Sequence, residues 1–252
     1  HVKAEAEGAI AELSPLLAFA SAEKTKANPF ILTAPPAIDA DNIWVNHQQR
    51  TRLAPLSFAI GAGERLTIVG QSGSGKSTLL QIFLGFCAYQ GDIFIDNQNF
   101  NTIDSTQFRH QIAYLSQQTM LLPMSIADNL RLPDPTASDD KLWQILAQVG
   151  LKPLIKALPN QLDTQLGERG SGLSGGQQRR LAIAQLLLQD AQLWLLDEPT
   201  EHLDSDTAAE INALLQQVTR GKTVLWVTHD ATNLPWLDRQ ISLDIASTLA
   251  KV

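Results

Sequence analysis

The sequence contains a single cysteine and no surplus of basic residues. Because Cys87 has no partner within the chain, an internal disulfide is excluded, and a reducing cytoplasm is the simplest setting. The chain has 19 lysines and arginines against 26 aspartates and glutamates, which gives a net charge of −7. A surface that follows nucleic-acid phosphates needs a basic excess, and the only local basic cluster is Arg179–Arg180. We therefore expect no nucleic-acid partner.

Long apolar runs are also missing. No run approaches the roughly 18 residues that a membrane span needs, and the sequence has no signal-peptide pattern. Hydrophobic residues still make up 44% of the 252 residues, which allows one large domain or two unequal lobes. The chain begins at His1 rather than at a methionine. We expect it to be a fragment excised from a longer protein.

Apolar strands alternate with helices through most of the chain, and this alternation predicts a mostly parallel α/β sheet covered on both faces. Residues 38–45 and 53–60 instead predict two antiparallel strands near the N-terminus. Residues 124–160 predict a helical insert, with Ser125 and Ser138 as caps and Gly150 as a stop. Ahead of these elements, residues 3–20 favour a helix and residues 25–37 a linker.

A glycine-rich loop lies between a predicted buried strand and a predicted helix. It fits the P-loop pattern G-x-x-x-x-G-K-[ST], whose backbone N–H groups cradle phosphates. Lys76 is placed to reach the β- and γ-phosphates, and the Ser77 hydroxyl to hold Mg²⁺. The alternative is a plain surface loop, but the flanking strand and helix favour the phosphate site. Its predicted nucleotide-binding residues are Gly70, Gln71, Ser72, Gly73, Ser74, Gly75, Lys76, Ser77 and Thr78.

Two carboxylates and a histidine end later apolar strands. Asp197 ends the strand 192–197, at the edge where open α/β sheets bind ligands, and is placed to hold Mg²⁺. Glu198 follows it and is placed to orient or deprotonate a water that attacks the γ-phosphate. His229 follows the strand 222–228 at the same edge, within reach of that phosphate. The alternatives are two solvated carboxylates and an ordinary loop histidine.

A second glycine-rich turn, "GLSGGQQRR" at 172–180, opens another helix. Gly175 and Gly176 allow a close backbone approach, and Ser174 is a natural N-cap. The positive end of such a helix suits a γ-phosphate. One nucleotide needs only one cradle, so this second turn calls for an explanation beyond the P-loop.

Taken in order, these motifs resemble the nucleotide-binding domain of an ABC transporter over residues 38 to about 243. The motifs are the P-loop, "LSGGQ" at 173–177, "LWLLDEPT", "HLD" at 202–204, and His229. The resemblance implies a P-loop ATPase that uses ATP and Mg²⁺. It implies that Gln117 in "YLSQQ" is a metal ligand and catalytic residue that couples Mg²⁺ to the membrane partner. It also implies nucleotide-binding roles for Ser174, Gly175, Gly176, Gln177 and Asp204.

The resemblance is to exporters, because "GERG" at 167–170 is similar to the segment that precedes their signature motif. In this chain the signature is "LSGGQ" at 173–177. It implies that residues 1–37 belong to a transmembrane domain of the same polypeptide. Residues 38–252 would be the nucleotide-binding domain, with a helical subdomain at about 117–175. The segments "GFCAYQGDIFID", "LPNQLDTQLGERG" and "DEPTEHLD" resemble heterodimeric CydDC-type exporters, and favour the D-type half. That family is associated with cysteine and glutathione export and cytochrome bd assembly, at the cytoplasmic face of the bacterial inner membrane.

The family geometry also explains the second glycine-rich turn. The signature lies far from the P-loop of its own subunit, so two chains are expected head to tail, each signature closing on the other's ATP. The groove near Gln117 is expected to expose Met120, Leu121, Leu122, Met124 and Ile126 to the membrane subunit. The alternative function is a non-transport ABC ATPase acting on soluble partners.

Three departures from the family pattern stand out. The aromatic residue that stacks on adenine upstream of the P-loop is missing, which leaves Trp44, His47 or neither in that role. His202 occupies a position that is usually small. The end of the chain lacks the usual glycine turn and acidic tail, so we expect a short or altered C-terminus.

Overall fold

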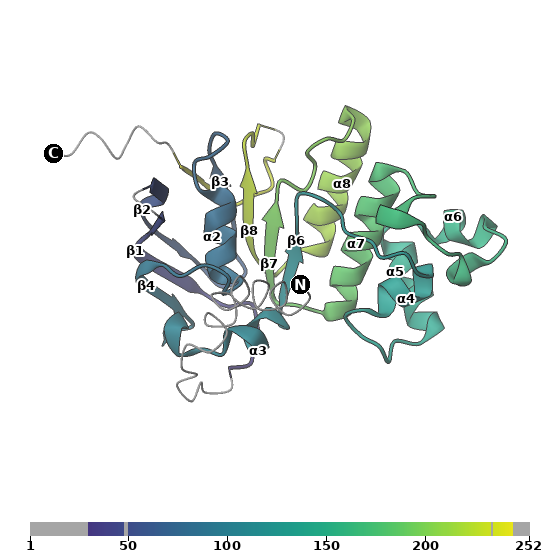
Figure 1. The fold of residues 1–252 in the computed structure, drawn as a ribbon, viewed down its shortest axis with the longest axis horizontal. Helices are drawn as coiled ribbons and strands as arrows, with labels where there is room; N and C mark the ends of the chain where they lie inside the picture. Colours follow the sequence, from purple (N-terminus) through teal and green to yellow (C-terminus); the bar gives the residue numbers. More distant parts are fainter. Residues whose placement is uncertain (1–29, 48–49, 233, 244–252) are drawn as a thin grey trace, which may run out of the picture.

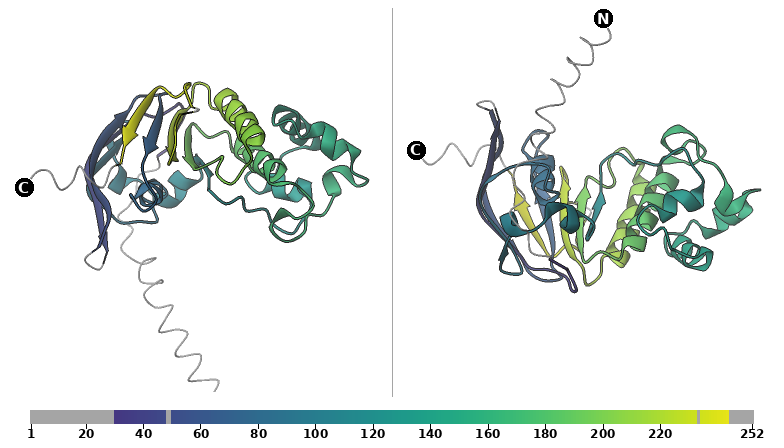
Figure 2. Two further views of the ribbon diagram at one scale, coloured as in Figure 1. Left: turned by 90° about the horizontal axis from the view of Figure 1, so that it is seen from above. Right: turned by 60° about the horizontal axis from the view of Figure 1, so that its bottom comes forward.

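The structure, a computed structural model, describes residues 30–47, 50–232 and 234–243. The predicted helix at 3–20, the first part of the predicted linker and the last nine residues lie outside the described residues. The described chain has three parts, which follow one another across Figure 1: an antiparallel sheet, a parallel sheet and a group of helices. Figure 2 shows the same order from two other directions.

Five parallel strands form the central sheet, in the spatial order β6-β7-β8-β3-β9. Every residue of β7 and β8 is buried, as expected for parallel strands covered on both faces. The predicted parallel core is thereby confirmed. The strands are β3 Arg65–Val69, β6 Ile112–Leu115, β7 Leu193–Asp197, β8 Thr223–Thr228 and β9 Arg239–Ser242.

A second, antiparallel sheet has the order β2-β1-β4-β5. Its strands are β1 Ile38–His47, β2 Arg50–Ile60, β4 Gln90–Ile95 and β5 Gln98–Asn99. Ile38 lies opposite both Ile60 and Ile95, and all three side chains are buried. The sheet thus turns an apolar face inward, and the predicted N-terminal antiparallel subdomain is confirmed. A 3-10 turn, η1 Phe100–Thr102, and α3 Ser105–Arg109 lead from this sheet to β6.

Helix α2, Lys76–Phe83, lies between the two sheets (Figure 1). Its buried Leu79 and Phe83 belong to one apolar cluster with Ile43 of β1 and Ile68 of β3. Gly75, which precedes the helix, has φ 103°, and a Cβ there would lie 2.6 Å from the Arg52 carbonyl oxygen. The glycine therefore permits both the left-handed turn and close contact with β2.

Three short helices form the insert: α4 Ile126–Arg131, α5 Asp139–Gln148 and α6 Lys152–Ala157. Ser125 and Ser138 cap α4 and α5, and Gly150, with φ 74°, follows the end of α5, as the sequence predicts. The turns η2 Gln161–Asp163 and η3 Glu168–Gly170 lead out of the insert. Helices α7 Gly175–Gln189 and α8 Ser205–Val218 lie between the insert and the parallel sheet (Figures 1 and 2).

The loop after Gln117 exposes fewer apolar side chains than expected. Met120 and Leu122 are exposed, whereas Met124 is half-buried. The expectation is wrong for Leu121 and Ile126, which belong to the core shared by the insert and α7. Ile126 begins α4 and turns inward with Leu130, four residues later on the same helical face.

Arg179 and Arg180, the basic pair of the sequence, connect elements of this chain to one another. The Arg179 side chain is buried in α7 and donates hydrogen bonds to the carbonyls of Ser116, at 2.6 Å, and Gln117. Arg180 donates to the Val149 carbonyl at 2.9 Å and pairs with Glu210 at 2.7 Å. Arg179 therefore holds the backbone of the Gln117 loop against the helix that begins at the signature.

We predict that Arg179→Met lowers the free energy of unfolding by about 1–3 kcal/mol, because two carbonyls lose a charged donor. Because methionine retains much of the apolar stem of the arginine side chain, the change in the free energy of unfolding reflects the lost hydrogen bonds. Urea unfolding measures it, with the exposed Arg220→Met as the matched control. Equal stabilities for the two variants would show that the Arg179 contacts contribute nothing.

Candidate functional site

Three parallel strands end at the same edge of the central sheet. Val69 of β3 lies opposite Thr228 of β8, and Asp197 of β7 lies opposite Val227. The next residues continue the pairing across this edge: the Gly70 amide donates to the Thr228 carbonyl at 3.2 Å, and the Glu198 amide donates to the Val227 carbonyl at 2.9 Å. The register therefore places the P-loop, Glu198 and His229 side by side.

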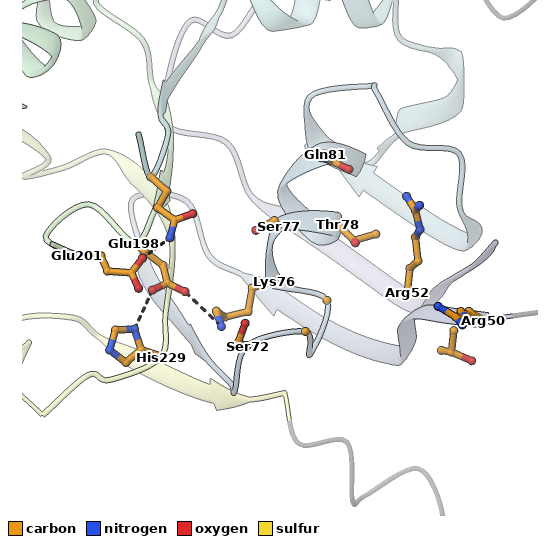
Figure 3. A pocket seen from close by; sticks show the side chains of 14 residues that line it. Arg50, Arg52, Ser72, Lys76, Ser77, Thr78, Gln81, Glu198, Glu201 and His229 are labelled. Atoms are coloured by element: carbon orange, nitrogen blue, oxygen red, sulfur yellow. Dashed lines mark hydrogen bonds and ion pairs between the residues drawn. The ribbon is translucent and has the colours of Figure 1, made fainter. Parts of the chain in front are cut away.

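A cavity of about 1070 Å³ opens at this edge (Figure 3). Glu198, Gln117 and His229, the three predicted catalytic residues, all line it. Six of the predicted P-loop positions also line it: Ser72, Gly73, Gly75, Lys76, Ser77 and Thr78. The structure thus brings the catalytic candidates and the phosphate cradle into one space.

Gly70, Gln71 and Ser74 do not line this cavity. The carbonyls of Gly70 and Gln71 accept hydrogen bonds from the Lys76 ammonium, at 2.6 and 3.1 Å. The Ser74 hydroxyl is buried against Gly70, where an added Cβ would lie 2.5 Å from it. These three residues shape the loop and hold its lysine.

Lys76 is 6% exposed, and its ammonium lies 3.3 Å from the Glu198 carboxylate. A buried charge needs compensation, and here two carbonyls and a carboxylate supply it. The same contacts hold the ammonium at the mouth of the P-loop. An anionic phosphate group entering the cavity can replace Glu198 as its partner.

Glu198 bridges Lys76 and His229 (Figure 3). Its backbone is left-handed, with φ 44°, an unusual conformation for a non-glycine residue that is enriched at functional sites. One carboxylate oxygen faces Lys76, and the other lies 2.7 Å from His229 Nδ1. Burial acts to raise the pKa of Glu198, but the His229 hydrogen bond and the Lys76 charge outweigh it and lower the pKa overall. At neutral pH Glu198 is therefore ionised and able to accept a proton.

Ser77 and Gln117, two of the three predicted metal ligands, line the cavity, whereas Asp197 is buried, does not line it and is hydrogen-bonded to Ser77. Burial first, and the Glu198 charge second, raise the pKa of Asp197, although a hydrogen bond from Ser77 opposes them. A divalent cation would offset this cost by pairing with the carboxylate. A hydroxyl, a carboxylate and an amide oxygen form the hard donor set that suits Mg²⁺. The predicted metal ligands therefore fit the ion.

Glu201 is a site residue that the sequence analysis missed. The Gln117 side-chain nitrogen donates to its carboxylate, which leaves the amide oxygen of Gln117 free for a cation. Glu201, Glu198 and His229 each place a ligand atom within 4.8 Å of the others. No sequence pattern predicts the contact between Glu201 and Gln117, because the two residues are 84 positions apart in the chain.

The second glycine-rich turn is built as a helix cap. The Ser174 hydroxyl accepts from the Gln177 amide at 3.3 Å, and the Gln177 side chain accepts from the Ser174 amide at 2.9 Å. Ser174 and Gly175 are exposed to solvent. A Cβ at Gly176 would lie 2.5 Å from the Thr207 side chain, so this glycine also permits close packing on α8.

Asp204 caps α8 and accepts from the Thr207 amide at 2.9 Å. Neither Asp204 nor residues 174–177 line the P-loop cavity. Within one chain, the two glycine-rich turns therefore face different spaces.

Among the described side chains, neither candidate for stacking on adenine lines the cavity. Trp44 lies opposite Gln90 in the antiparallel sheet and does not line the cavity, and the His47 side chain lies outside the described residues. Arg50, Thr51 and Arg52 of β2 line it instead, and the sequence analysis missed them. His202, with φ 62°, lines a smaller neighbouring cavity together with Glu201 and His229.

The family model described as ABC transporter matches residues 53–201, which is more than half of the chain. Among solved structures, a bacterial Atm1-family ABC exporter with ATP bound matches with a TM-score of 0.80 at 30% identity. That match covers 88% of this chain and 39% of the exporter chain. Among the helices of the described residues, none is long and apolar enough to cross a membrane.

Two curated relatives come from Escherichia coli K12. The glutathione/L-cysteine transport system ATP-binding/permease protein CydC is 41% identical over 198 residues, which are 78% of this chain and 34% of CydC. The corresponding CydD protein is 32% identical over 236 residues, which are 93% of this chain and 40% of CydD. The chain therefore spans between a third and two fifths of the length of these relatives.

We predict that Lys76→Met raises the pKa of Glu198, because the lysine charge is lost while the burial remains. In the parent chain the lowered folded-state pKa means that ionised Glu198 stabilises the fold at neutral pH. This contribution is lost as the pH falls through the folded-state pKa, and in the variant the loss should begin at higher pH. A ¹³C NMR titration of labelled glutamate measures the shift.

Lys222→Met, which removes a lysine paired with Asp190 away from the cavity, is the control. If Glu198 titrates identically in both variants, Lys76 does not set its ionisation.

Proposed function

This chain belongs to the ABC transporter family, and on that premise we propose that it is the ATP-hydrolysing motor domain of an exporter. The observation that supports the hydrolytic role most directly is the series of contacts from Lys76 through Glu198 to His229 at the P-loop cavity. It joins a phosphate-binding cation, an ionised carboxylate and an imidazole. A glycine-rich loop that only caps a helix does not require a lysine, a carboxylate and a histidine in contact with one another.

Each side chain then has a distinct task in hydrolysis. Lys76 exchanges its contact with Glu198 for the β- and γ-phosphates, and Glu198 becomes free to take a proton from the attacking water. His229 holds the Glu198 carboxylate in place and contributes a hydrogen bond at the γ-phosphate. Ser77, Asp197 and Gln117 would hold Mg²⁺, which would neutralise charge on the phosphates.

The signature supports a second chain as partner. Residues 174–177 form a capped helix N-terminus in which Ser174 and Gly175 are exposed to solvent, and none of the four lines the P-loop cavity. Two chains head to tail would place each signature over the other's P-loop, where free N–H groups and the positive helix end favour a γ-phosphate. Asp204, at the start of α8 beside the signature, would lie at the same interface. In the full transporter the partner is a homologous chain, and we expect a heterodimer.

A transmembrane domain of the same polypeptide is the second proposed partner. The curated relatives carry both ATP-binding and permease parts by name, and this chain matches only a third to two fifths of their length. Met120 is 81% exposed in the loop that begins at Gln117, and it offers an apolar contact to such a domain. These relatives favour transport over an ATPase that acts on soluble partners.

The CydC and CydD names suggest the cargo. We propose cysteine or glutathione export at the cytoplasmic face of the bacterial inner membrane, with a role in cytochrome bd assembly. The chain is similar to both halves of that system, so the D-type half remains a prediction. The boundaries at 37/38 and about 117–175 remain predictions as well.

We predict that Glu198→Gln binds ATP but lowers turnover by about 10² or more, the range for loss of a general base. Phosphate release measures turnover, and equilibrium binding measures ATP affinity. Glu210→Gln removes the same charge outside the cavity and should keep parental turnover. A Glu198→Gln chain that hydrolyses as fast as this control would refute the role of Glu198 as the base.

We predict that Ser174→Arg leaves ATP binding intact and abolishes turnover, because the arginine fills the space that the partner's phosphate needs. Ser138→Arg is the matched control, since Ser138 caps α5 through an equivalent 3.3 Å hydrogen bond to a backbone amide. Loss of a cap alone should therefore affect both variants equally, and loss of turnover should affect only Ser174→Arg.

Mixing Ser174→Arg with Lys76→Ala should restore one working site in each mixed dimer. The first chain supplies the intact P-loop and the second the intact signature. A mixture that associates yet stays as inactive as its components would show that the signature does not act in the partner's site.

A further inference from the structure

Two arginines of β2, Arg50 and Arg52, line the cavity at the end opposite to His229 (Figure 3). Across Figure 3 the labelled side chains follow one another in the order His229, Lys76, Thr78 and Arg52, with Arg50 beyond them. Lys76 and Thr78 belong to the P-loop and α2, whereas the arginines come from the antiparallel sheet. The two sheets thus supply opposite ends of one cavity.

The alternation of β2 puts both guanidinium groups on the outer face of the strand. Successive side chains of a strand point to opposite faces, so Arg50 and Arg52 share a face while Leu53 turns into the core. The backbone of Arg52 passes close to the P-loop, because a Cβ on Gly75 would lie 2.6 Å from the Arg52 carbonyl oxygen.

Neither guanidinium forms an ion pair or a hydrogen bond with any residue that the structure describes. By contrast, Arg65, Arg131, Arg180 and Arg239 are all paired with carboxylates. Within the part of the chain that the structure describes, Arg50 and Arg52 thus line the cavity without an ion-pair or hydrogen-bond partner, and they are available to a ligand.

The order of the residues along the cavity indicates which part of a nucleotide would lie beside Arg50 and Arg52. If the proposed function holds, the γ-phosphate lies at Glu198 and His229 and the other phosphates lie along the P-loop. The base then reaches beyond Thr78 to β2. Among the described residues no phenylalanine, tyrosine or tryptophan lines the cavity, and the planar side chains that line it at this end are the guanidinium groups of Arg50 and Arg52.

We propose that Arg50 and Arg52 form the base-binding end of the site, with a guanidinium plane stacking on the purine in place of an aromatic ring. Guanidinium groups are planar and weakly hydrated, and they stack on bases and aromatic faces. The phosphates already have the P-loop amides and Lys76 as partners. The arginine pair therefore acts on the nucleoside, and it makes affinity depend on the base.

The test compares Mg-ATP with inorganic tripolyphosphate, which has the phosphates but no nucleoside, by isothermal titration of this chain. The double variant Arg50→Ala/Arg52→Ala should bind ATP more weakly, on the order of tenfold, and bind tripolyphosphate as the parent does. Arg50→Ala/Arg52→Lys, which keeps one charge but loses the plane, should stay weak. Arg50→Ala/Arg52→Tyr should recover ATP affinity, because tyrosine restores a planar face.

Two control variants separate this proposal from the nucleotide site itself. Arg220→Ala removes an exposed arginine outside the cavity and should change neither affinity. Lys76→Ala should weaken ATP and tripolyphosphate alike; if it weakens neither, the phosphate site is misassigned, whatever the arginines do.

Three results would overturn the arginine proposal while the phosphate site stands. One is unchanged ATP affinity in the double alanine variant. Another is an equal loss for ATP and tripolyphosphate that lysine restores, which would assign the pair to the phosphates. The third is loss of ATP affinity in His47→Ala but not in the arginine variants, which would assign the base to that histidine.

Discussion

The parallel pairing of β3, β7 and β8 is the constraint on which the site depends. Each strand is short and buried, and each ends at the same edge with a functional residue directly after it: Gly70, Glu198 and His229. A slip of one residue in any of these strands would move its side chains to the opposite face of the sheet, where a different set of helices packs, and would carry the residue after the strand to the wrong level. The apolar packing of α2 on one face of the sheet and of α7 and α8 on the other thus also sets the geometry of the cavity.

Charge balance within that edge follows from the same geometry. Lys76 and Glu198 are both nearly buried, and each compensates the other at 3.3 Å. His229 holds the second oxygen of Glu198, so the carboxylate stays ionised although burial opposes it. Around this pair, Arg179 fixes the backbone that carries Gln117, and Glu201 accepts from its amide. The result is a site with its charged groups placed before a nucleotide enters, which limits the reorganisation that binding requires.

The sequence predicts the parts of this site that depend on local chain geometry. The P-loop, the caps Ser125, Ser138 and Ser174, and the strand-ending residues all follow from motif spacing or from a strand and its next residue. Contacts between segments that are distant in the sequence could not be predicted in this way. That Arg52 lies against Gly75, that Glu201 meets Gln117, and that Arg179 is buried beneath the same loop depend on how the two sheets and the helices pack. The same holds for Leu121 and Ile126, because the sequence near Gln117 does not distinguish an apolar residue that faces solvent from one that packs in the core.

If residues 174–177 act in ATP hydrolysis as proposed, a second chain must complete the site, because these residues do not line the cavity that holds Lys76 and Glu198. Sedimentation equilibrium of the Glu198→Gln chain with Mg-ATP tests this most directly, since slow hydrolysis preserves the bound nucleotide. We expect this chain to be a dimer with Mg-ATP and a monomer without it, and to be a monomer under both conditions when Ser174→Arg is added. A Glu198→Gln chain that is saturated with ATP and remains monomeric would contradict it.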